Sequence, residues 1–269
     1  MRLLRAEVSQ PKLRQFLREM DGRSHEGLPQ EPPYSVSLVV PCFRHAQYLP
    51  ATLESIDAQT RRPDEVIFVD DASPDATGEI VEAFLEGRRG PSGCRFELLV
   101  NERNLGQAAS LNKAIAAASS DLIMIVNDDD YLMHDAVETA LAVFDRHRDV
   151  ALTGGFCVAF SGDDELRAAP KLTSAYGAAG PRLVIKRPED VPRYRNYNDL
   201  NMTHSGSCFF KVAWEAVGGY RADAARRVVP FSDRDFQLRV NAVWPVAVAY
   251  ETPLALWREG SSVDAGVNS

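Results

Sequence analysis

Residues 37–150 alternate short apolar runs with amphipathic segments, and this alternation constrains the fold more than any other feature of the chain. The apolar runs, which have the length of buried strands, lie at 37–41, 66–69, 96–100 and 122–126. Between them, apolar residues recur at helical spacing, as Leu49, Leu53 and Ile56 do. Strands and helices that alternate at such short intervals form a mostly parallel sheet with helices on both faces. We therefore predict an α/β, Rossmann-like fold.

The alternation stops near residue 150, and this divides the chain into unequal parts. We expect an N-terminal helix and linker (1–34), one domain (35–262) and a tail (263–269), the domain having a regular half (35–150) and a mixed half (151–262). The mixed half begins with an expected strand at about 150–160. A polar stretch punctuated by Pro and Gly follows it, and such a stretch is typical of irregular structure.

Acidic residues directly follow two of the predicted strands. Asp70 and Asp71 end one of them, and Asp128, Asp129 and Asp130 follow the strand at 122–126. The carboxyl ends of parallel strands share one edge of a sheet, and open α/β sheets bind their ligands there. Three adjacent carboxylates repel one another unless a cation or several hydrogen-bond donors compensate them. A divalent cation bridging carboxylates and phosphates would do so, and we predict such a site at this edge.

Charge and hydropathy limit the partners of the chain. A net charge of −8 argues against binding to nucleic acid. Four scattered cysteines fit a reducing cytoplasm, and no apolar run approaches the roughly 18 residues of a membrane span. Residues 3–20 have an amphipathic pattern that predicts a helix docked on the domain or on a partner. The alternative is peripheral contact of this helix with the inner face of a membrane.

Four segments resemble, in order, the motifs of family 2 glycosyltransferases. Residues 37–77 end in VDDASPDAT, which is similar to the family's VDDGSTDGT, and residues 104–136 place NDDD at the DXD motif. Residues 205–240 contain SGSCFFK and FSDRDFQ, similar to the acceptor-side segment and the ED motif, and LALWREGSS resembles the segment that closes the catalytic domain. The resemblance implies the GT-A fold, with 35–150 as the nucleotide-sugar half and 151–262 as the acceptor half.

For the donor side, the resemblance implies a site for a nucleotide-diphosphate sugar. Pro41, Cys42 and Phe43 would line the nucleobase pocket, and Asp71 would accept the ring N–H of the base. That N–H belongs to uracil or thymine, so the expected donor is UDP- or dTDP-linked. Asn112 also falls on a family position, and we include it among the donor-binding residues.

For metal binding and catalysis, the resemblance implies roles for three aspartates. Asp129 would be the principal ligand of Mn²⁺ or Mg²⁺, and Asp128 would approach the ribose or the metal. Asp233 would be the general base that deprotonates the acceptor hydroxyl for a single displacement that inverts the anomeric carbon. The acceptor would be a glycan, a lipid-linked sugar or a small molecule. We expect Asp235 instead to pair with Arg239, one helical turn later.

Apart from Arg44, which stands where the family usually has Asn, the chain departs from the family pattern at three places. Asn127 and Ser232 replace acidic residues of the DXD and ED motifs, and no histidine follows Arg258, where the family often has one. These departures keep a second hypothesis open, in which a weak or inactive protein binds a nucleotide sugar or a glycan. A nucleotidyltransferase of the same fold would instead carry a Gly-rich loop where this chain has PCFRHAQYL. His204 precedes the acceptor-side strand, and we leave it outside the catalytic set.

Overall fold

The structure, a computed structural model, describes most of the 269-residue chain. The described residues are 7–21, 27–86, 88, 93–168, 182–250 and 252–261. The predicted tail at 263–269, part of the predicted linker and the first residues of the predicted N-terminal helix lie outside them.

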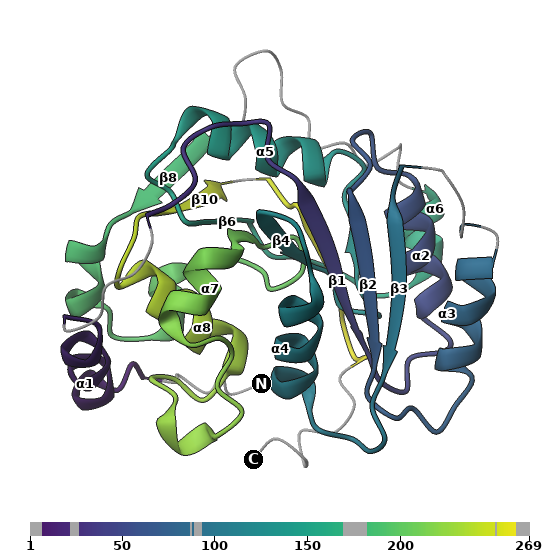
Figure 1. Ribbon diagram of the computed structural model, residues 1–269, viewed down its shortest axis with the longest axis horizontal. Helices are drawn as coiled ribbons and strands as arrows, with labels where there is room; N and C mark the ends of the chain where they lie inside the picture. Colours follow the sequence, from purple (N-terminus) through teal and green to yellow (C-terminus); the bar gives the residue numbers. More distant parts are fainter. Residues whose placement is uncertain are drawn as a thin grey trace.

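The first half forms the predicted parallel sheet. Its strands are β1 (Val36–Cys42), β2 (Glu65–Asp70), β3 (Arg95–Val100) and β4 (Leu122–Ile125), and they lie in the order β3-β2-β1-β4. Its helices are α2 (Leu49–Asp57), α3 (Thr77–Glu86), α4 (Gln107–Ala117) and α5 (Ala136–Arg146). Figure 1 shows α4 on one side of β1–β3 and α2 and α3 on the other. Every residue of β1, β2 and β4 is buried, as expected of strands covered on both faces.

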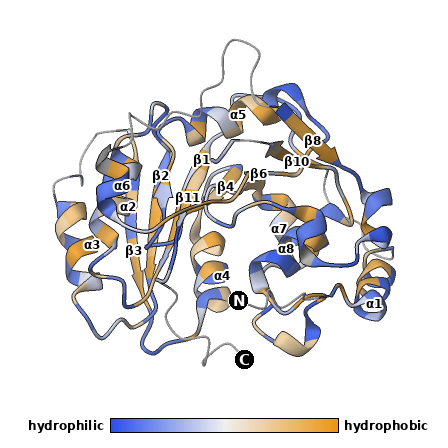
Figure 2. Cartoon of the chain, turned by 180° about the vertical axis from the view of Figure 1, so that it is seen from behind, coloured by the Kyte–Doolittle hydropathy of each residue, from blue (hydrophilic) through white to orange (hydrophobic). Residues whose placement is uncertain are grey.

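The second half extends the same sheet with strands of both directions. β9 (Cys208–Phe210) pairs antiparallel with β4 and with β6 (Leu152–Gly155), β10 (Val246–Tyr250) runs parallel to β6, and β8 (Arg182–Lys186) closes the edge in the antiparallel sense. The result is an eight-stranded sheet, which confirms the predicted mostly parallel fold with a mixed second half. Figure 2 shows the hydrophobic residues gathered on its strands and on the helix faces turned toward them.

The predicted strand at 150–160 is wrong in one respect, because the structure divides it between two sheets. β6 ends at Gly155, where a Cβ atom would lie 2.3 Å from the backbone nitrogen of Leu254. This close approach of two backbones requires glycine and turns the chain out of the large sheet. β7 (Val158–Phe160) then joins a small second sheet with β5 (Tyr131–Leu132) and β11 (Ala255–Arg258). This sheet brings the end of the chain back to the residues after β4.

The described residues of the second half form further helices. They are α6 (Asp163–Ala168), α7 (Lys211–Val217) and α8 (Ser232–Asn241), with short 3₁₀ turns η1 (Pro188–Arg193), η2 (Tyr197–Leu200) and η3 (Ala224–Arg226). α8 begins directly after Phe231 and carries the predicted general base in its first turn. Figure 1 shows α7 and α8 packed beside each other, across from α4.

The N-terminal helix α1 (Gln10–Asp21) docks on its own domain, as one of the two sequence hypotheses held. Its apolar side chains Leu13, Phe16 and Met20 are buried in the core. The chain just before it hydrogen-bonds to the acceptor half, since Val8 N donates to Arg195 O at 3.0 Å. The apolar side chains that the structure describes on this helix are therefore packed against the domain. In the described part of the chain, no helix is long and apolar enough to cross a membrane.

Candidate active site

The three consecutive aspartates after β4 are all buried, and each is held by different partners. Their side chains emerge in the turn between β4 and β5, where Asp128, Asp129 and Asp130 are 4%, 9% and 2% exposed. Three carboxylates buried this deeply require many donors or a cation. The contacts described below show that hydrogen bonds reach each of the three carboxylates and leave Oδ1 of Asp129 without a described partner.

Asp128 is held by the loop that follows β1. The backbone N–H of Phe43 donates to its Oδ2 at 2.9 Å, and Nδ1 of His45 lies 2.7 Å from its Oδ1. Burial raises the pKa of Asp128 to about 6. Burial alone would lower the pKa of His45, but the hydrogen bond and the charge of Asp128 raise it to about 9. The two side chains therefore form a buried ion pair at neutral pH.

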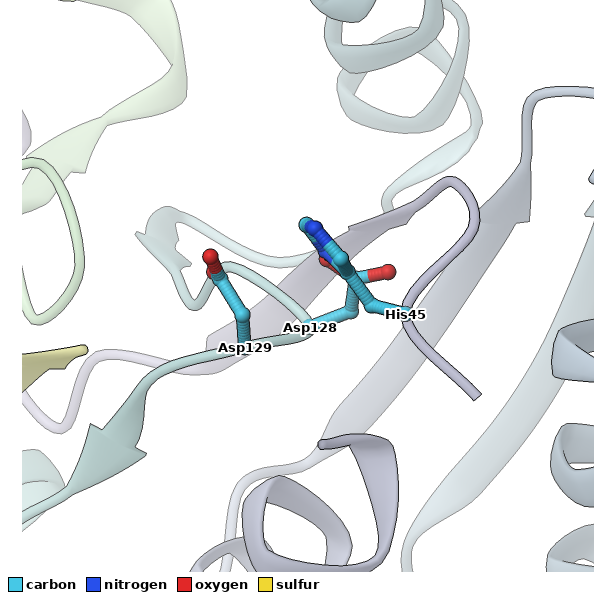
Figure 3. Close-up of side chains that lie close together, drawn as sticks. All are labelled: His45, Asp128 and Asp129. Carbon is cyan, nitrogen blue, oxygen red and sulfur yellow. The ribbon is translucent and has the colours of Figure 1, made fainter. Parts of the chain in front are cut away.

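His45 is a site residue that the sequence reasoning missed. Its Nδ1 faces Asp128, and its Nε2 lies 3.1 Å from the carbonyl oxygen of Ser261, at the end of the described chain. Ligand atoms of His45, Asp128 and Asp129 lie within 4.8 Å of one another, and Figure 3 shows the three side chains gathered in one place. One imidazole and two carboxylates are a donor set that fits a divalent transition metal such as Mn²⁺.

Asp129 and Asp130 are fixed by the strand β11 and the turn after it. Ser261 Oγ donates to Asp129 Oδ2 at 2.6 Å, and Arg258 Nε donates to the Asp129 carbonyl at 2.9 Å. Asp130 accepts from the backbone N–H of Arg258 at 3.0 Å and from Ser205 Oγ at 2.5 Å. Burial, followed by the charge of Asp129, raises the pKa of Asp130 to about 7. Asp130 thus anchors the turn, while Oδ1 of Asp129 has no hydrogen bond to a described residue.

The predicted nucleobase residues lie at the end of β1, between the two acidic clusters. Pro41 and Cys42 are buried strand residues, and Phe43 is half-buried. The backbone N–H of Asp71 donates to the Cys42 carbonyl at 2.9 Å, and the next residue, Phe43, contacts Asp128. Asp71 and Asp128 therefore flank the same strand end, as the sheet topology predicts.

Asp71 holds the turn that precedes α4. Its Oδ1 accepts from Asn101 Nδ2 and from the backbone N–H of Leu105, each at 2.8 Å. Its Oδ2 accepts only from the backbone N–H of Gly106, at 2.8 Å. A carboxylate oxygen can accept two hydrogen bonds, so Oδ2 retains the capacity to accept one from a ligand.

Asn112 was expected on the donor side, but its amide is directed at the acceptor half. Its Nδ2 donates to the Tyr220 carbonyl at 2.7 Å. Its Oδ1 accepts from the backbone N–H of Tyr220 at 2.8 Å and from Trp214 Nε1 at 3.1 Å. Three hydrogen bonds to one segment favour a structural role, in which Asn112 ties α4 to the chain after α7.

Asp233 lies in the first turn of α8, where it is half-buried. Within the described residues its carboxylate makes no hydrogen bond and no ion pair, although its charge acts on His204 and Tyr220. Asp235, two residues later, is completely buried and pairs with Arg239 at 2.9 Å, which confirms the predicted pair. One helix turn thus contains a structural aspartate and an aspartate without a structural partner.

The mostly parallel sheet with a mixed second half is that of a GT-A protein, and comparison with known proteins identifies the family. The model of the family described as "Glycosyl transferase family 2" matches residues 37–215, which is more than half of the chain. The chain therefore belongs to the family 2 glycosyltransferases.

Relatives and solved structures agree with this assignment. Glycosyltransferase GlyG of Streptococcus pneumoniae serotype 4 is 36% identical over 104 residues, which are 39% of this chain and 33% of GlyG. This chain thus spans about a third of the length of that relative. The structure of S. aureus TarS 1-349 in complex with UDP-GlcNAc has a TM-score of 0.62 at 17% identity, covering 85% of this chain and 60% of that one.

A second solved structure contains a metal ion. Mannosyltransferase PcManGT from Pyrobaculum calidifontis, in complex with GDP-Man and Mn²⁺, has a TM-score of 0.58 at 17% identity. The match covers 91% of this chain and 64% of that one. At such low identity these two likenesses show the shared GT-A fold alone.

Proposed function

We propose that the chain is a metal-dependent, inverting glycosyltransferase that moves one sugar from a UDP- or dTDP-linked donor to an acceptor hydroxyl. The observation that carries this proposal is the pairing of both acidic clusters with the end of β1. Asp71 contacts Cys42, and Asp128 contacts Phe43, at 2.9 Å in each case. A nucleoside diphosphate laid across this strand end would have its base near Asp71 and its phosphates near Asp128 and Asp129.

The metal would be held by Asp129 and Asp128, and by His45 once its imidazole gives up a proton and its contact with Asp128 or Ser261. Oδ1 of Asp129 is available, and each oxygen of Asp128 has one partner, which leaves room for a second contact. A divalent ion there would neutralise the negative charge that develops on the leaving diphosphate. The resemblance predicts an imidazole after Arg258, which this chain lacks, and His45 would supply one from the loop after β1, where it contacts Ser261. Because imidazole suits transition metals better than Mg²⁺, we expect Mn²⁺ to bind more tightly than Mg²⁺.

The nucleobase would be held by Asp71 and Phe43. Oδ2 of Asp71 can accept the ring N–H that uracil and thymine share, and guanine presents a different pattern of donors there. Phe43 is half-buried and directly follows Cys42, whose carbonyl accepts from the Asp71 backbone N–H, and its ring would cover one face of the base. The acceptor capacity of Asp71 supports a uridine or thymidine donor, whereas the ring of Phe43 would stack on any base.

Asp233 would act as the general base. The acceptor oxygen forms a bond to the anomeric carbon as the bond from that carbon to the diphosphate breaks, and the electron pair leaves with the diphosphate. The acceptor proton passes to the Asp233 carboxylate, which no described structural partner occupies. A glycan, a lipid-linked sugar or a small molecule could supply the hydroxyl. The four free cysteines support the cytoplasm as the place of action.

One observation favours the second hypothesis, a protein that binds a nucleotide sugar without turning it over. His45 and Ser261 already satisfy one oxygen each of Asp128 and Asp129, so the cluster is stable without a metal. A metal ion could use Oδ1 of Asp129 directly, but His45 would have to leave Asp128 or Ser261 before it ligates the ion. The two hypotheses share a donor site and differ in turnover.

A thermal-shift series tests the donor site directly. UDP-GlcNAc, dTDP-glucose and GDP-mannose are each added to the chain with Mn²⁺, with Mg²⁺ and with EDTA. A ligand at 100 times its Kd stabilises the folded state by about 2.7 kcal/mol, which raises Tm by about 5–10 °C for a chain of this size. We expect this rise with a uridine or thymidine donor and Mn²⁺, and a much smaller one with EDTA. A rise with GDP-mannose alone, or no rise with any donor, would contradict the proposed donor site.

A further inference from the structure

His204 lies on the segment that connects the aspartate turn to the helix of the general base. On one side, Ser205 Oγ donates to Asp130 and accepts from the backbone N–H of Asn127 at 2.9 Å. These contacts fix the segment to the end of β4. His204 therefore lies close to the aspartate turn in space, although at least 74 residues separate them in the sequence.

The same segment is fixed to α8 on its other side. Gln237 Nε2 donates to the Thr203 carbonyl at 3.2 Å, and Arg234 Nη1 donates to the Leu200 carbonyl at 3.2 Å. Both donors belong to the helix that begins with the predicted general base. His204 thus lies on a segment that is fixed to the helix whose first turn carries Asp233.

Tyr220 orients the imidazole of His204. Nε2 of His204 lies 3.1 Å from the Tyr220 hydroxyl, and the two rings meet edge to face with their centroids 5.7 Å apart. Tyr220 is 2% exposed, and its ring stacks on Phe236 with centroids 4.4 Å apart. The side chain of Asn112 hydrogen-bonds to both the backbone carbonyl and the backbone N–H of Tyr220. A tyrosine fixed this firmly sets the direction of the histidine ring.

The other ring nitrogen of His204 is free to meet a ligand. Nδ1 has no hydrogen bond to any residue that the structure describes, and the side chain as a whole is only half-buried. Burial lowers the pKa of His204, so the imidazole is neutral at pH 7. When Nε2–H donates to the Tyr220 oxygen, Nδ1 carries a lone pair and acts as a hydrogen-bond acceptor.

We propose that Nδ1 of His204 and the carboxylate of Asp233 bind two O–H groups of the attacking molecule. The proposal rests on the proposed function. Asp233 accepts the proton of the reacting hydroxyl, and His204 accepts a hydrogen bond from the neighbouring hydroxyl and exchanges no proton. The acceptor class that supplies two adjacent hydroxyls is a sugar or another vicinal diol. Water meets both contacts with its two hydrogens, so hydrolysis of the donor uses the same pair of groups.

Two substitutions separate this role from a structural one. The amide group of Asn is attached at Cγ, so in His204→Asn it occupies the position of Nδ1. The amide group of Gln is one bond further from the backbone, so in His204→Gln it occupies the position of Nε2. A binding role through Nδ1 predicts that His204→Asn retains activity and His204→Gln loses it. A structural role through the contact with Tyr220 predicts the reverse order.

The measurement is release of UDP from UDP-GlcNAc with Mn²⁺ and water as the acceptor, together with UDP affinity and thermal unfolding for each folded variant. We expect His204→Asn to stay within about threefold of the unmodified chain and His204→Gln to lose about tenfold in kcat, with UDP affinity unchanged in both. The reverse order, or equal rates for both variants, would overturn the role of His204. If the unmodified chain releases no UDP from UDP-GlcNAc, UDP-glucose or UDP-galactose, the proposed function fails first and this inference fails with it.

A matched pair of acceptors tests the substrate class. Propane-1,2-diol and propan-1-ol are added at equal concentration, and the sugar transferred to each is measured by mass spectrometry. We expect the unmodified chain to prefer the diol at least fivefold, and His204→Gln to lose this preference. Equal transfer to both alcohols by the unmodified chain would overturn the diol class.

Discussion

Replacing Asp233 by Asn should reduce donor turnover by about 10³-fold and leave donor binding unchanged. A general base supplies on the order of 10²–10⁴ in rate, and an amide of the same shape cannot take the acceptor proton. The carboxylate has no hydrogen bond or ion pair in the described part of the chain, so the substitution should leave the free energy of unfolding nearly unchanged. The measurement is UDP release under saturating donor, beside the thermal shift that the same donor produces.

The matched control for this experiment is Asp57→Asn. Asp57 is an exposed aspartate on α2 that pairs with Arg88 away from the acidic clusters. It should retain the turnover of the unmodified chain, since exposed ion pairs contribute little. Turnover of Asp233→Asn within tenfold of the unmodified chain would exclude Asp233 as the base.

Replacing Asp129 by Asn should abolish tight Mn²⁺ binding and reduce turnover by at least about 10²-fold. An amide ligates a divalent ion more weakly than a carboxylate does, and it removes one negative charge that balances the metal. Changes in groups that only support metal ligands already cost 10–100-fold in affinity, so a direct ligand should cost at least as much. Electron paramagnetic resonance of free Mn²⁺ measures this affinity without any donor or turnover.

Asp130→Asn provides the contrast within the same turn. Asp130 is held by Ser205 and by the backbone of Arg258, so its replacement should lower stability more than it lowers Mn²⁺ affinity. If Asp129→Asn binds Mn²⁺ as tightly as the unmodified chain, or if Asp130→Asn is the variant that loses the metal, the assignment of the ligands is wrong.

The sequence was sufficient to predict what depends on periodicity and on parallel sheet geometry. The apolar runs located β1 to β4, and the carboxyl ends of parallel strands share an edge, which is enough to predict that Asp71 and Asp128 lie near each other. Asp235 and Arg239 are one helical turn apart, so their pairing was also predictable. These features depend on contacts that are local or that repeat regularly.

His45 could not be predicted in this way because its position depends on a single irregular turn. Arg44 has a φ of 60°, and this left-handed conformation turns the chain after β1 so that the next side chain faces Asp128. Ser261 reaches Asp129 from 132 residues away through the pairing of β11 with β5. Neither contact leaves a periodic pattern in the sequence. The one available signal for His45 was a histidine just after a strand that borders an acidic cluster.

The predicted strand at 150–160 failed for a related reason. Its apolar pattern is continuous, but the backbone of Gly155 packs against the chain at 252–254 and sends the two halves into different sheets. A contact between segments about 100 residues apart decides this division. The contacts of Asn112 also depend on a distant segment, since its amide side chain hydrogen-bonds to Trp214 and Tyr220.

Proton NMR of the sugar released from an α-linked UDP-sugar, recorded in the first minutes with Mn²⁺ present, tests the proposed reaction most directly. A single displacement assisted by Asp233 predicts that the β anomer forms first and that the α anomer accumulates only by later mutarotation. The signal should disappear with EDTA and in Asp233→Asn. Initial release of the α anomer would contradict the inverting mechanism, and no release from any α-linked UDP- or dTDP-sugar would contradict the proposed function itself.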